Sequence, residues 1–328
     1  MILKKFKLIP LSGDASFRKY YRKFIREKKL TTIIVTSKKE KYKNLLVYSA
    51  INQFLLRQNI KTPRTLFKNY KKGYIEIEDF GNTTVYKLLK KSRNKFKIYK
   101  EIVDLLIKLQ KIRPKKIKNF SDKNCKLENY TIKNLNKESN LFFDWYLPLI
   151  LKKKQIKKVK TILKKKLQKI YKGLKFKNNI FVHRDFHVSN LMKIKNKIGV
   201  IDSQDAIIGN PAYDLSSLID DVRIKIPNKL KKNIFNYYLC KGPKVYKNRR
   251  SDFMHDFNIL SVQRNLKIIG IFSRLFKRDK KKQYLKLLPY AWQILEVSLK
   301  EKIFSEVSYI LDKFITKKNR KKIKFHEG

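Results

Sequence analysis

The chain has 328 residues, 42% of them hydrophobic, which is enough for one large two-lobed domain or two smaller domains with real cores. No stretch approaches the roughly 18 uninterrupted apolar residues of a membrane span, and the N-terminal sequence lacks the apolar core and cleavage site of a signal peptide. We therefore expect a cytoplasmic protein. Cys125 and Cys240 are far apart and outside any Cys/His cluster, which argues against a disulfide framework or a structural zinc.

The formal net charge of +56 would by itself indicate nucleic acid or an anionic membrane as partner. The positive residues, however, are mostly lysine, are spread over the whole chain and accompany many Ile and Asn, as an AT-rich coding sequence would produce. A binding surface should instead cluster its charge and favour arginine with interleaved aromatic residues. We expect neither nucleic acid nor membrane as main partner, and a monomer that acts on a small molecule.

Residues 1–79 predict a small strand-rich lobe. β-Branched and aromatic residues favour strands at 17–25, 31–36 and 74–78. Apolar residues with a helical period favour a helix over 42–58, between the second and third of these strands. This lobe is where we expect a nucleotide to bind.

The remainder, 80–328, is predicted to be mostly helical, with long helical patterns at 86–109 and 141–171. A lysine-rich stretch at 152–172 could suggest a membrane or nucleic-acid surface, but its apolar stripe predicts one buried face of an ordinary surface helix. The predicted fold class is α+β, with a strand-rich N-terminal lobe and a mostly helical C-terminal lobe for catalysis and substrate.

The residues with the clearest chemistry lie in FVHRDFHVSNLM (181–192) and in IGVIDSQDA (198–206). Phosphoryl transfer needs a carboxylate to accept the proton of the attacking hydroxyl, and oxygen ligands that hold Mg²⁺ on the phosphates of ATP. We predict Asp185 as the base and Asn190 and Asp202 as the metal ligands. His183 and Arg184 are expected to hold the loop by hydrogen bonds.

These residues resemble the HRD-x-x-x-x-N catalytic loop and the DFG aspartate of protein kinases. The form H-x-D-x-H-x-x-N, followed by IDxxDA and GNPAYDLSSL (209–218), is more similar still to the aminoglycoside phosphotransferase and choline kinase superfamily. The resemblance implies a two-lobed, protein-kinase-like fold, ATP and Mg²⁺ as cofactors, and a role for Asp214 in bracing the catalytic loop.

Two further segments, one near each end of the chain, resemble one particular branch of this superfamily. PLSGDASFRKYYR (10–22) and SVQRNLKIIGIFSRLFKRD (261–279) are similar to bacterial kinases that phosphorylate N-acetylmuramate and N-acetylglucosamine at the anomeric hydroxyl during cell-wall recycling. The resemblance implies an ATP-dependent amino-sugar kinase. Candidate contacts to the sugar are His187, Gln204, Asp205 and Arg264.

The chain departs from these patterns at two positions. Ser203 stands where the cell-wall branch has an aromatic residue beside the metal-binding aspartate. The strand TTIIVTS lacks the lysine that protein kinases use to hold the phosphates, so Arg18 or Arg22 is expected to replace it. The turn at residues 12–16 supplies three further nucleotide-binding candidates, Gly13, Asp14 and Ser16. Because the turn has only one glycine, a hairpin tip without function is an alternative.

A second DFG sequence, Asp79-Phe80-Gly81, comes too early in the chain to bind metal, because a metal-binding DFG follows the catalytic loop. Its place after a strand and before a helix instead suits the hinge between lobes. There the backbone of Glu78, Asp79 and Phe80 is expected to meet adenine, with Gly81 giving freedom to turn.

Other functions stay open at the level of sequence. An aminoglycoside, choline or homoserine kinase shares the catalytic loop, and a cationic substrate would call for an acidic pocket, for which the chain offers Asp205, Asp220, Asp221 and Asp252. A catalytically inactive nucleotide-binding module would explain Ser203 and the missing lysine. Against that alternative, the base and both metal ligands are present.

Overall fold

The computed structural model describes residues 6–11, 18–25, 30–38, 43–113, 117–118, 124–125 and 127–321. The chain forms two compact units, which we describe separately. The first comprises Met1–Glu128 and Ile180–Ile208, and the second Asn129–Asn179 and Gly209–Gly328. None of the described helices is both long and apolar enough to cross a membrane.

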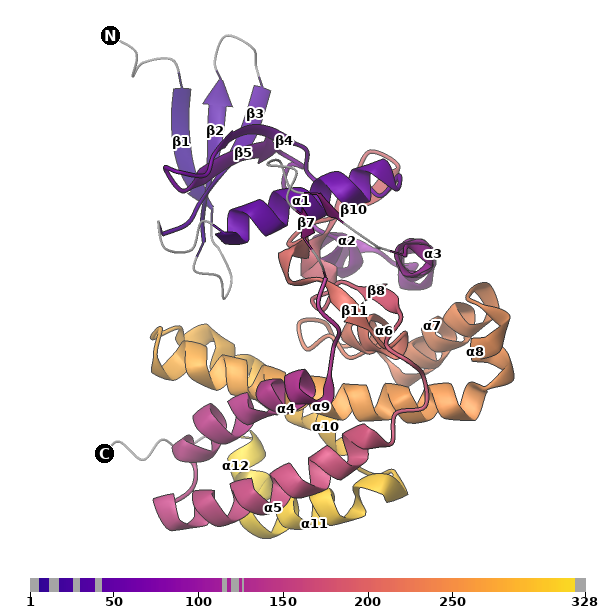
Figure 1. Cartoon of the computed structure of the whole chain (residues 1–328). Coiled ribbons are helices and arrows are strands. Elements are labelled where there is room, and N and C mark those ends of the chain that lie inside the picture. Colours follow the sequence, from indigo (N-terminus) through magenta and orange to yellow (C-terminus); the bar gives the residue numbers. More distant parts are fainter. Residues whose placement is uncertain are drawn as a thin grey trace. The chain divides into compact units, whose positions relative to one another are not determined.

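The first unit contains a five-stranded antiparallel sheet with the strand order β1-β2-β3-β5-β4 (Figure 1). Its strands are β1 (Phe6–Leu11), β2 (Lys19–Ile25), β3 (Leu30–Thr36), β4 (Thr65–Asn69) and β5 (Tyr74–Glu78). The three strands predicted from sequence are β2, β3 and β5. The two edge strands, β1 and β4, were not predicted, because their residues are mostly exposed and show no alternation of buried and exposed positions.

Helix α1 (Lys43–Arg57) confirms the helix expected at 42–58 and packs its apolar side chains against the sheet. Leu45 and Tyr48 of the helix share a buried core with Ile33, Val35 and Ile75 of the two central strands. This core fixes α1 against β3 and β5. Residues 79–81 follow directly after β5.

The helical pattern at 86–109 forms two helices, α2 (Val85–Lys91) and α3 (Lys95–Lys111), rather than one. The break has a local cause. Asn94 caps α3 by accepting a hydrogen bond from the backbone N–H of Lys97, and such a cap requires non-helical backbone at its own position. Thr84 caps α2 in the same way.

Short strands complete the first unit. They are β6 (Ile117–Lys118), β7 (Asn124–Cys125), β8 (Ile180–Val182), β9 (Leu191–Ile194), β10 (Lys197–Val200) and β11 (Ile207–Gly209). The two 3₁₀ turns between them are η5 (Val188–Asn190) and η6 (Ser203–Asp205). The apolar runs NIFV and KIGVID thus form β8 and β10 on either side of the polar loop, as the sequence predicts.

The second unit is helical. Its helices are α4 (Ile132–Leu141), the π-helix η3 (Phe142–Tyr146), the 3₁₀ helix η4 (Leu147–Leu149), α5 (Lys153–Lys172), α6 (Ala212–Ile219), α7 (Asn228–Lys241), α8 (Lys244–Asn248), α9 (Arg250–Lys277), η7 (Lys282–Leu287), α10 (Leu288–Ser298), η8 (Lys302–Phe304), α11 (Ser305–Phe314) and α12 (Lys317–Lys321). The expected single helix at 141–171 is therefore wrong, since Pro148 and the π-helix separate α4 from α5. A strand-rich N-terminal sheet followed by a mostly helical remainder confirms the α+β class.

Helix α9 is the centre of the second unit and contacts α4, α6 and α10. At Gly270 the approach is so close that a Cβ would lie 2.3 Å from the carbonyl carbon of Leu141 and 2.5 Å from the backbone nitrogen of Phe142. Only glycine allows the two backbones to pack at this distance.

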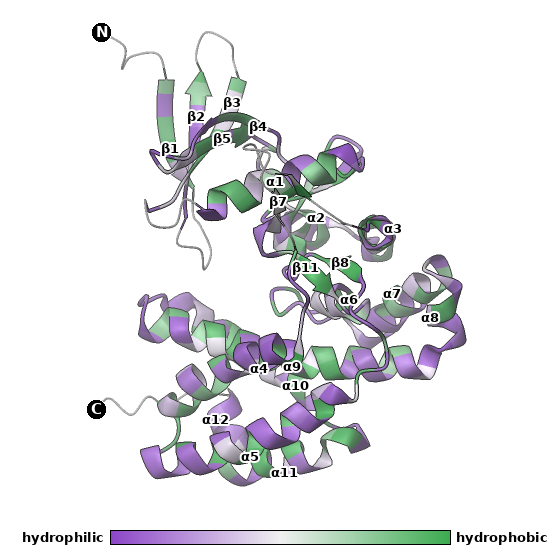
Figure 2. Ribbon diagram, in the orientation of Figure 1, coloured by the Kyte–Doolittle hydropathy of each residue, from purple (hydrophilic) through white to green (hydrophobic). Residues whose placement is uncertain are grey.

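Helix α5 carries the lysine-rich stretch. Figure 2 shows hydrophilic residues interleaved with hydrophobic ones along it, and the buried residues include Val159, Leu163 and Leu167. It packs against α4 and α11. The apolar stripe is the buried face of a surface helix, as expected, and the lysines form its exposed side.

Candidate functional site: a phosphoryl-transfer loop in the first unit

The loop after β8 is held by bonds to the segment that follows β10. His183 is fully buried, and its Nε2 lies 3.1 Å from the carbonyl oxygen of Ile201. Arg184 donates from Nη1 to the carbonyl oxygen of Asp205 at 3.3 Å. Both side chains thus act on backbone groups, which is the scaffold role expected for them. Arg184 also has a φ of 72°, an uncommon conformation for a non-glycine residue and one that often marks functional loops.

Asn190 is oriented within the same loop. Its Nδ2 donates to the carbonyl oxygen of Asp185 at 3.0 Å, and its own carbonyl oxygen accepts from the N–H of Ile201 at 3.0 Å. Among the described residues no group donates to Asn190 Oδ1. The amide oxygen is therefore available to a ligand while the rest of the residue is fixed.

Asp202 follows β10 directly and has a left-handed conformation, with φ 65° and ψ 39°. Its carboxylate accepts a bond from Arg18 Nη2 at 3.0 Å. Burial raises the pKa of Asp202; Arg18 opposes this rise, and the nearby carboxylates of Asp185 and Asp205 add to it. Three carboxylates close enough to repel one another form a site that a cation would stabilise.

The donor set fits Mg²⁺. This ion prefers carboxylate and carbonyl-type oxygens and is commonly bound by one or two protein ligands, with substrate phosphates and water completing its shell. Asp202 offers a carboxylate, and Asn190 offers an amide oxygen that accepts from no donor within the part of the chain that the structure describes. The structure thus brings together Asp185, Asn190 and Asp202, the three residues on which the predicted chemistry depends.

Arg18 lies immediately before β2, and its side chain is 4% exposed. The guanidinium also lies over the ring of Tyr48, 5.8 Å from the ring centroid, within the range of a cation–π contact. Of the two arginines considered as substitutes for the missing strand lysine, Arg18 is therefore the one that pairs with Asp202.

Arg22 pairs with a different carboxylate, that of Asp79. It forms a two-pronged ion pair with Asp79, with Nε 2.6 Å from Oδ2 and Nη2 3.0 Å from Oδ1, and it also donates to the carbonyl oxygen of Gly81. The pair lowers the pKa of Asp79, although burial alone would raise it. Arg22 thus fastens residues 79–81 to β2, and Gly81 turns there with a φ of 78°.

The predicted adenine-binding segment lies at the end of β5. The backbone N–H of Glu78 donates to the carbonyl oxygen of Arg64 at 2.9 Å, so this N–H is not available to hydrogen-bond adenine. The Glu78 side chain is paired with Lys61 at 2.8 Å, and the Lys61 ammonium lies 5.2 Å from the centroid of the Phe80 ring. Phe80 in turn packs so closely on Gly199 that a Cβ there would lie 2.9 Å from the ring.

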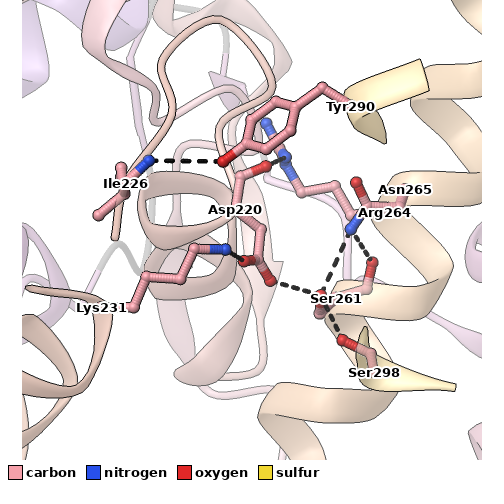
Figure 3. A network of polar contacts seen from close by, with 8 residues as sticks. All are labelled: Asp220, Ile226, Lys231, Ser261, Arg264, Asn265, Tyr290 and Ser298. Carbon is pink, nitrogen blue, oxygen red and sulfur yellow. Dashed lines mark hydrogen bonds and ion pairs between the residues drawn. The ribbon is translucent and has the colours of Figure 1, made fainter. Parts of the chain in front are cut away.

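The remaining candidates have diverse settings. Gly13, Asp14 and Ser16 lie outside the described residues. His187 is buried, and Gln204 donates to the exposed Asp205 at 2.8 Å while its own Oε1 has no partner among the described residues. Arg264 belongs to the second unit, where it is buried and donates to the carbonyl oxygen of Asp220 at 3.4 Å (Figure 3).

Three acidic residues of the second unit are already neutralised. Asp220 accepts from Lys231 and from Ser261, each at 2.6 Å (Figure 3). Asp221 is fully buried and pairs with Arg223 at 3.2 Å, and Asp252 pairs with Arg249 at 2.8 Å. None of the three is a bare carboxylate that awaits a cationic ligand.

Sequence reasoning missed Asn52, which accepts a hydrogen bond from Ser203 at 2.6 Å although the two residues are 151 positions apart. Both are fully buried. A polar residue within the apolar face of α1 was the available signal, since a buried amide must find partners. The partner itself could not be read from the sequence.

The chain belongs to the phosphotransferase enzyme family, which matches residues 7–250. The matched region contains the loop with Asp185 and Asn190, as well as Asp202 and Arg18.

Curated relatives carry one name. N-acetylmuramate/N-acetylglucosamine kinase of Pseudomonas aeruginosa is 28% identical over 299 residues, covering 89% of this chain and 83% of the relative. The enzyme of the same name from Neisseria meningitidis serogroup B is 26% identical over 296 residues, covering 87% and 84%. Among solved structures, amicoumacin kinase hAmiN in complex with AMP-PNP, Ca²⁺ and Ami has a TM-score of 0.61 at 13% identity, covering 93% of this chain and 92% of that one. The fold is the protein-kinase-like fold of the aminoglycoside phosphotransferases and choline kinases.

Proposed function

We propose that the chain is an ATP- and Mg²⁺-dependent kinase that phosphorylates N-acetylmuramate or N-acetylglucosamine at the C1 hydroxyl, in the cytoplasm and as part of cell-wall recycling. The observation that carries the proposal is the convergence of Asp185, Asn190 and Asp202 in a chain whose curated relatives carry this kinase name. We further propose a monomer with a nucleotide-binding lobe at residues 1–79 and a catalytic lobe at 80–328.

In this proposal Asp185 accepts the proton of the sugar hydroxyl while the hydroxyl oxygen forms a bond to the γ-phosphorus and the bond to the β,γ-bridging oxygen breaks, releasing ADP. Asn190 and Asp202 would hold Mg²⁺, which when bound neutralises the charge of the β- and γ-phosphates. Arg18 would supply a second cation beside them. An anomeric hydroxyl is more acidic than an ordinary alcohol, so the carboxylate of Asp185 needs little help to accept its proton.

The charges of the second unit favour a neutral or anionic acceptor over a cationic one. A cationic substrate such as choline or an aminoglycoside is best held by carboxylates that lack other partners. Asp220, Asp221 and Asp252 each carry an arginine or lysine partner instead. Hydroxyl and N-acetyl groups of a sugar need hydrogen-bonding groups, such as the side chain of Gln204, whose Oε1 is without a partner among the described residues.

The experiment is phosphorus NMR of the products formed from ATP, Mg²⁺ and each free sugar, in parallel with the corresponding 1-O-methyl glycosides. We expect a sugar 1-phosphate signal from the free sugars and none from the glycosides, whose C1 oxygen is blocked. Phosphorylation of the glycosides, or activity only on choline, homoserine or an aminoglycoside, would contradict the substrate. ATP binding without transfer to any acceptor would favour the inactive-module alternative.

A further inference from the structure

Helix α1 presents two polar side chains, Tyr48 and Asn52, one turn apart on its buried side, where they are 3% and 0% exposed. Each contacts a neighbour of Asp202. The Tyr48 ring lies under the guanidinium of Arg18, which pairs with the Asp202 carboxylate. Asn52 Oδ1 accepts from the hydroxyl of Ser203, the next residue in the chain.

The position of Asn52 is itself fixed by several bonds. Its Nδ2 donates to the carbonyl oxygen of Pro63 at 3.3 Å, and its carbonyl oxygen accepts from the Thr62 hydroxyl at 3.0 Å. These bonds hold the backbone and the amide of Asn52 in place while its Oδ1 accepts from Ser203.

Asp202 needs such support because of its backbone. Aspartate adopts the left-handed region more readily than most non-glycine residues, but the conformation is still uncommon and persists where the surroundings hold it. The bond from Ser203 to Asn52 anchors the residue next to Asp202, and Arg18 anchors its carboxylate from another direction.

We propose that Tyr48 and Asn52 are positioning residues that hold Arg18 and Ser203 and thereby aim the Asp202 carboxylate at the metal. This inference rests on the proposed function and assigns a role to Ser203, the residue that departs from the aromatic of the related kinases. The serine is then a working replacement that exchanges an aromatic contact for a hydrogen bond to α1.

The test is calorimetric titration of ATP with and without Mg²⁺ on Ser203→Ala and Asn52→Leu. Loss of a group that orients a metal ligand typically weakens metal-dependent binding by about tenfold or more. We expect each variant to lose about tenfold in ATP affinity with Mg²⁺ present and little in its absence. Because both substitutions remove the same bond, the double variant should be no weaker than Asn52→Leu alone.

Three further variants separate positioning from stability. Ser49→Ala changes a buried polar residue of the same helix whose hydroxyl bonds to the carbonyl oxygen of Leu45, away from Asp202, and it should leave the Mg²⁺ effect intact. Tyr48→Phe keeps the ring under Arg18 and should bind ATP nearly as the unchanged protein does, whereas Tyr48→Leu should not.

The outcomes distinguish this inference from the proposed function. If the unchanged protein shows no Mg²⁺-dependent ATP binding, both are overturned. If it does, and Ser203→Ala keeps the full Mg²⁺ effect, the positioning role alone is overturned. A lower melting temperature in Ser203→Ala with an unchanged Mg²⁺ effect has the same consequence, because it assigns the bond to stability only.

Discussion

Arg18 and Asp202 lie 184 positions apart in sequence, yet Nη2 of the one is 3.0 Å from the carboxylate of the other. If Arg18 replaces the lysine missing from β3, Arg18→Ala should weaken ATP binding about tenfold or more, because hydrogen bonds to charged groups contribute about 1.5–3 kcal/mol. Calorimetry with MgATP measures this. Arg18→Lys should restore part of the affinity, since it keeps the charge but not the planar fork.

The matched control is Arg57→Ala, which removes the same charge from an exposed position at the end of α1. It should change ATP affinity very little. Equal losses in the two variants would mean that Arg18 acts through net charge alone.

Asp185 is predicted to accept the proton of the attacking hydroxyl. Asp185→Asn keeps the shape and removes the acceptor, so kcat should fall by on the order of 10² to 10⁴ while the affinity for ATP stays close to its original value. Steady-state kinetics and calorimetry on the same preparation check both halves. A nearly unchanged kcat would transfer the role to another group, with Asp205 the first to test.

Asp202 is predicted to bind the metal. ATP should bind far more tightly with Mg²⁺ than without it, and Asp202→Ala should remove most of that difference. The measurement is the ratio of the two dissociation constants in each protein. Equal ATP affinity with and without Mg²⁺ in the unchanged protein would exclude this site as a metal site.

The Arg22–Asp79 pair should give a pH-dependent stability. The folded-state pKa of Asp79 is lowered, so its contribution is present above the unfolded value and is lost as pH falls through the folded value. Asp79→Asn should cost about 3 kcal/mol in the free energy of unfolding at pH 7, since it leaves Arg22 without its carboxylate. Urea unfolding should give the same difference at pH 5 and a smaller one below about pH 4. A difference that grows on acidification would contradict this assignment.

Gly270 tests the packing of the second unit. Gly270→Ala would drive a methyl group into the backbone of Leu141 and Phe142, so we expect a loss of about 3 kcal/mol in the free energy of unfolding, or failure to fold. Ser273→Ala, one turn further along α9, removes only a hydroxyl bonded to the carbonyl oxygen of Ile269 and should cost about 1 kcal/mol. Similar losses in both variants would mean that α9 and α4 can move apart.

Sequence reasoning found the elements whose residues carry a periodic signal. Strand β5 alternates buried and partly buried positions, β3 is rich in β-branched residues, and α1 has a helical period, so all three were predicted close to their observed bounds. Edge strand β1 is almost wholly exposed, and nothing in its residues distinguishes it from a loop. The break between α2 and α3 falls in the polar run KKSRNK (90–95), where Asn94 caps α3, so the sequence carried a signal for it that the single predicted pattern passed over.

The candidate site likewise contains some residues that the sequence indicates and others whose contacts only the structure shows. Asp185, Asn190 and Asp202 could be singled out from the sequence because their chemistry and spacing are local to one motif, and their roles stay predictions. The choice between Arg18 and Arg22 could not be made from the sequence, because the two residues are only four positions apart, and only the tertiary structure shows that Arg18 pairs with Asp202 and Arg22 with Asp79. The partnership of Asn52 and Ser203 depends likewise on a contact between distant segments.

Ser203 also bears on how such an enzyme could be regulated. In protein kinases the packing of the aromatic residue after the metal-binding aspartate helps to set active and inactive states. A serine that is fully buried and bonded to α1 has no bulky ring to swing out of place. We therefore expect the output of this kinase to follow the supply of nucleotide and acceptor in the cell, with no on–off control at this turn.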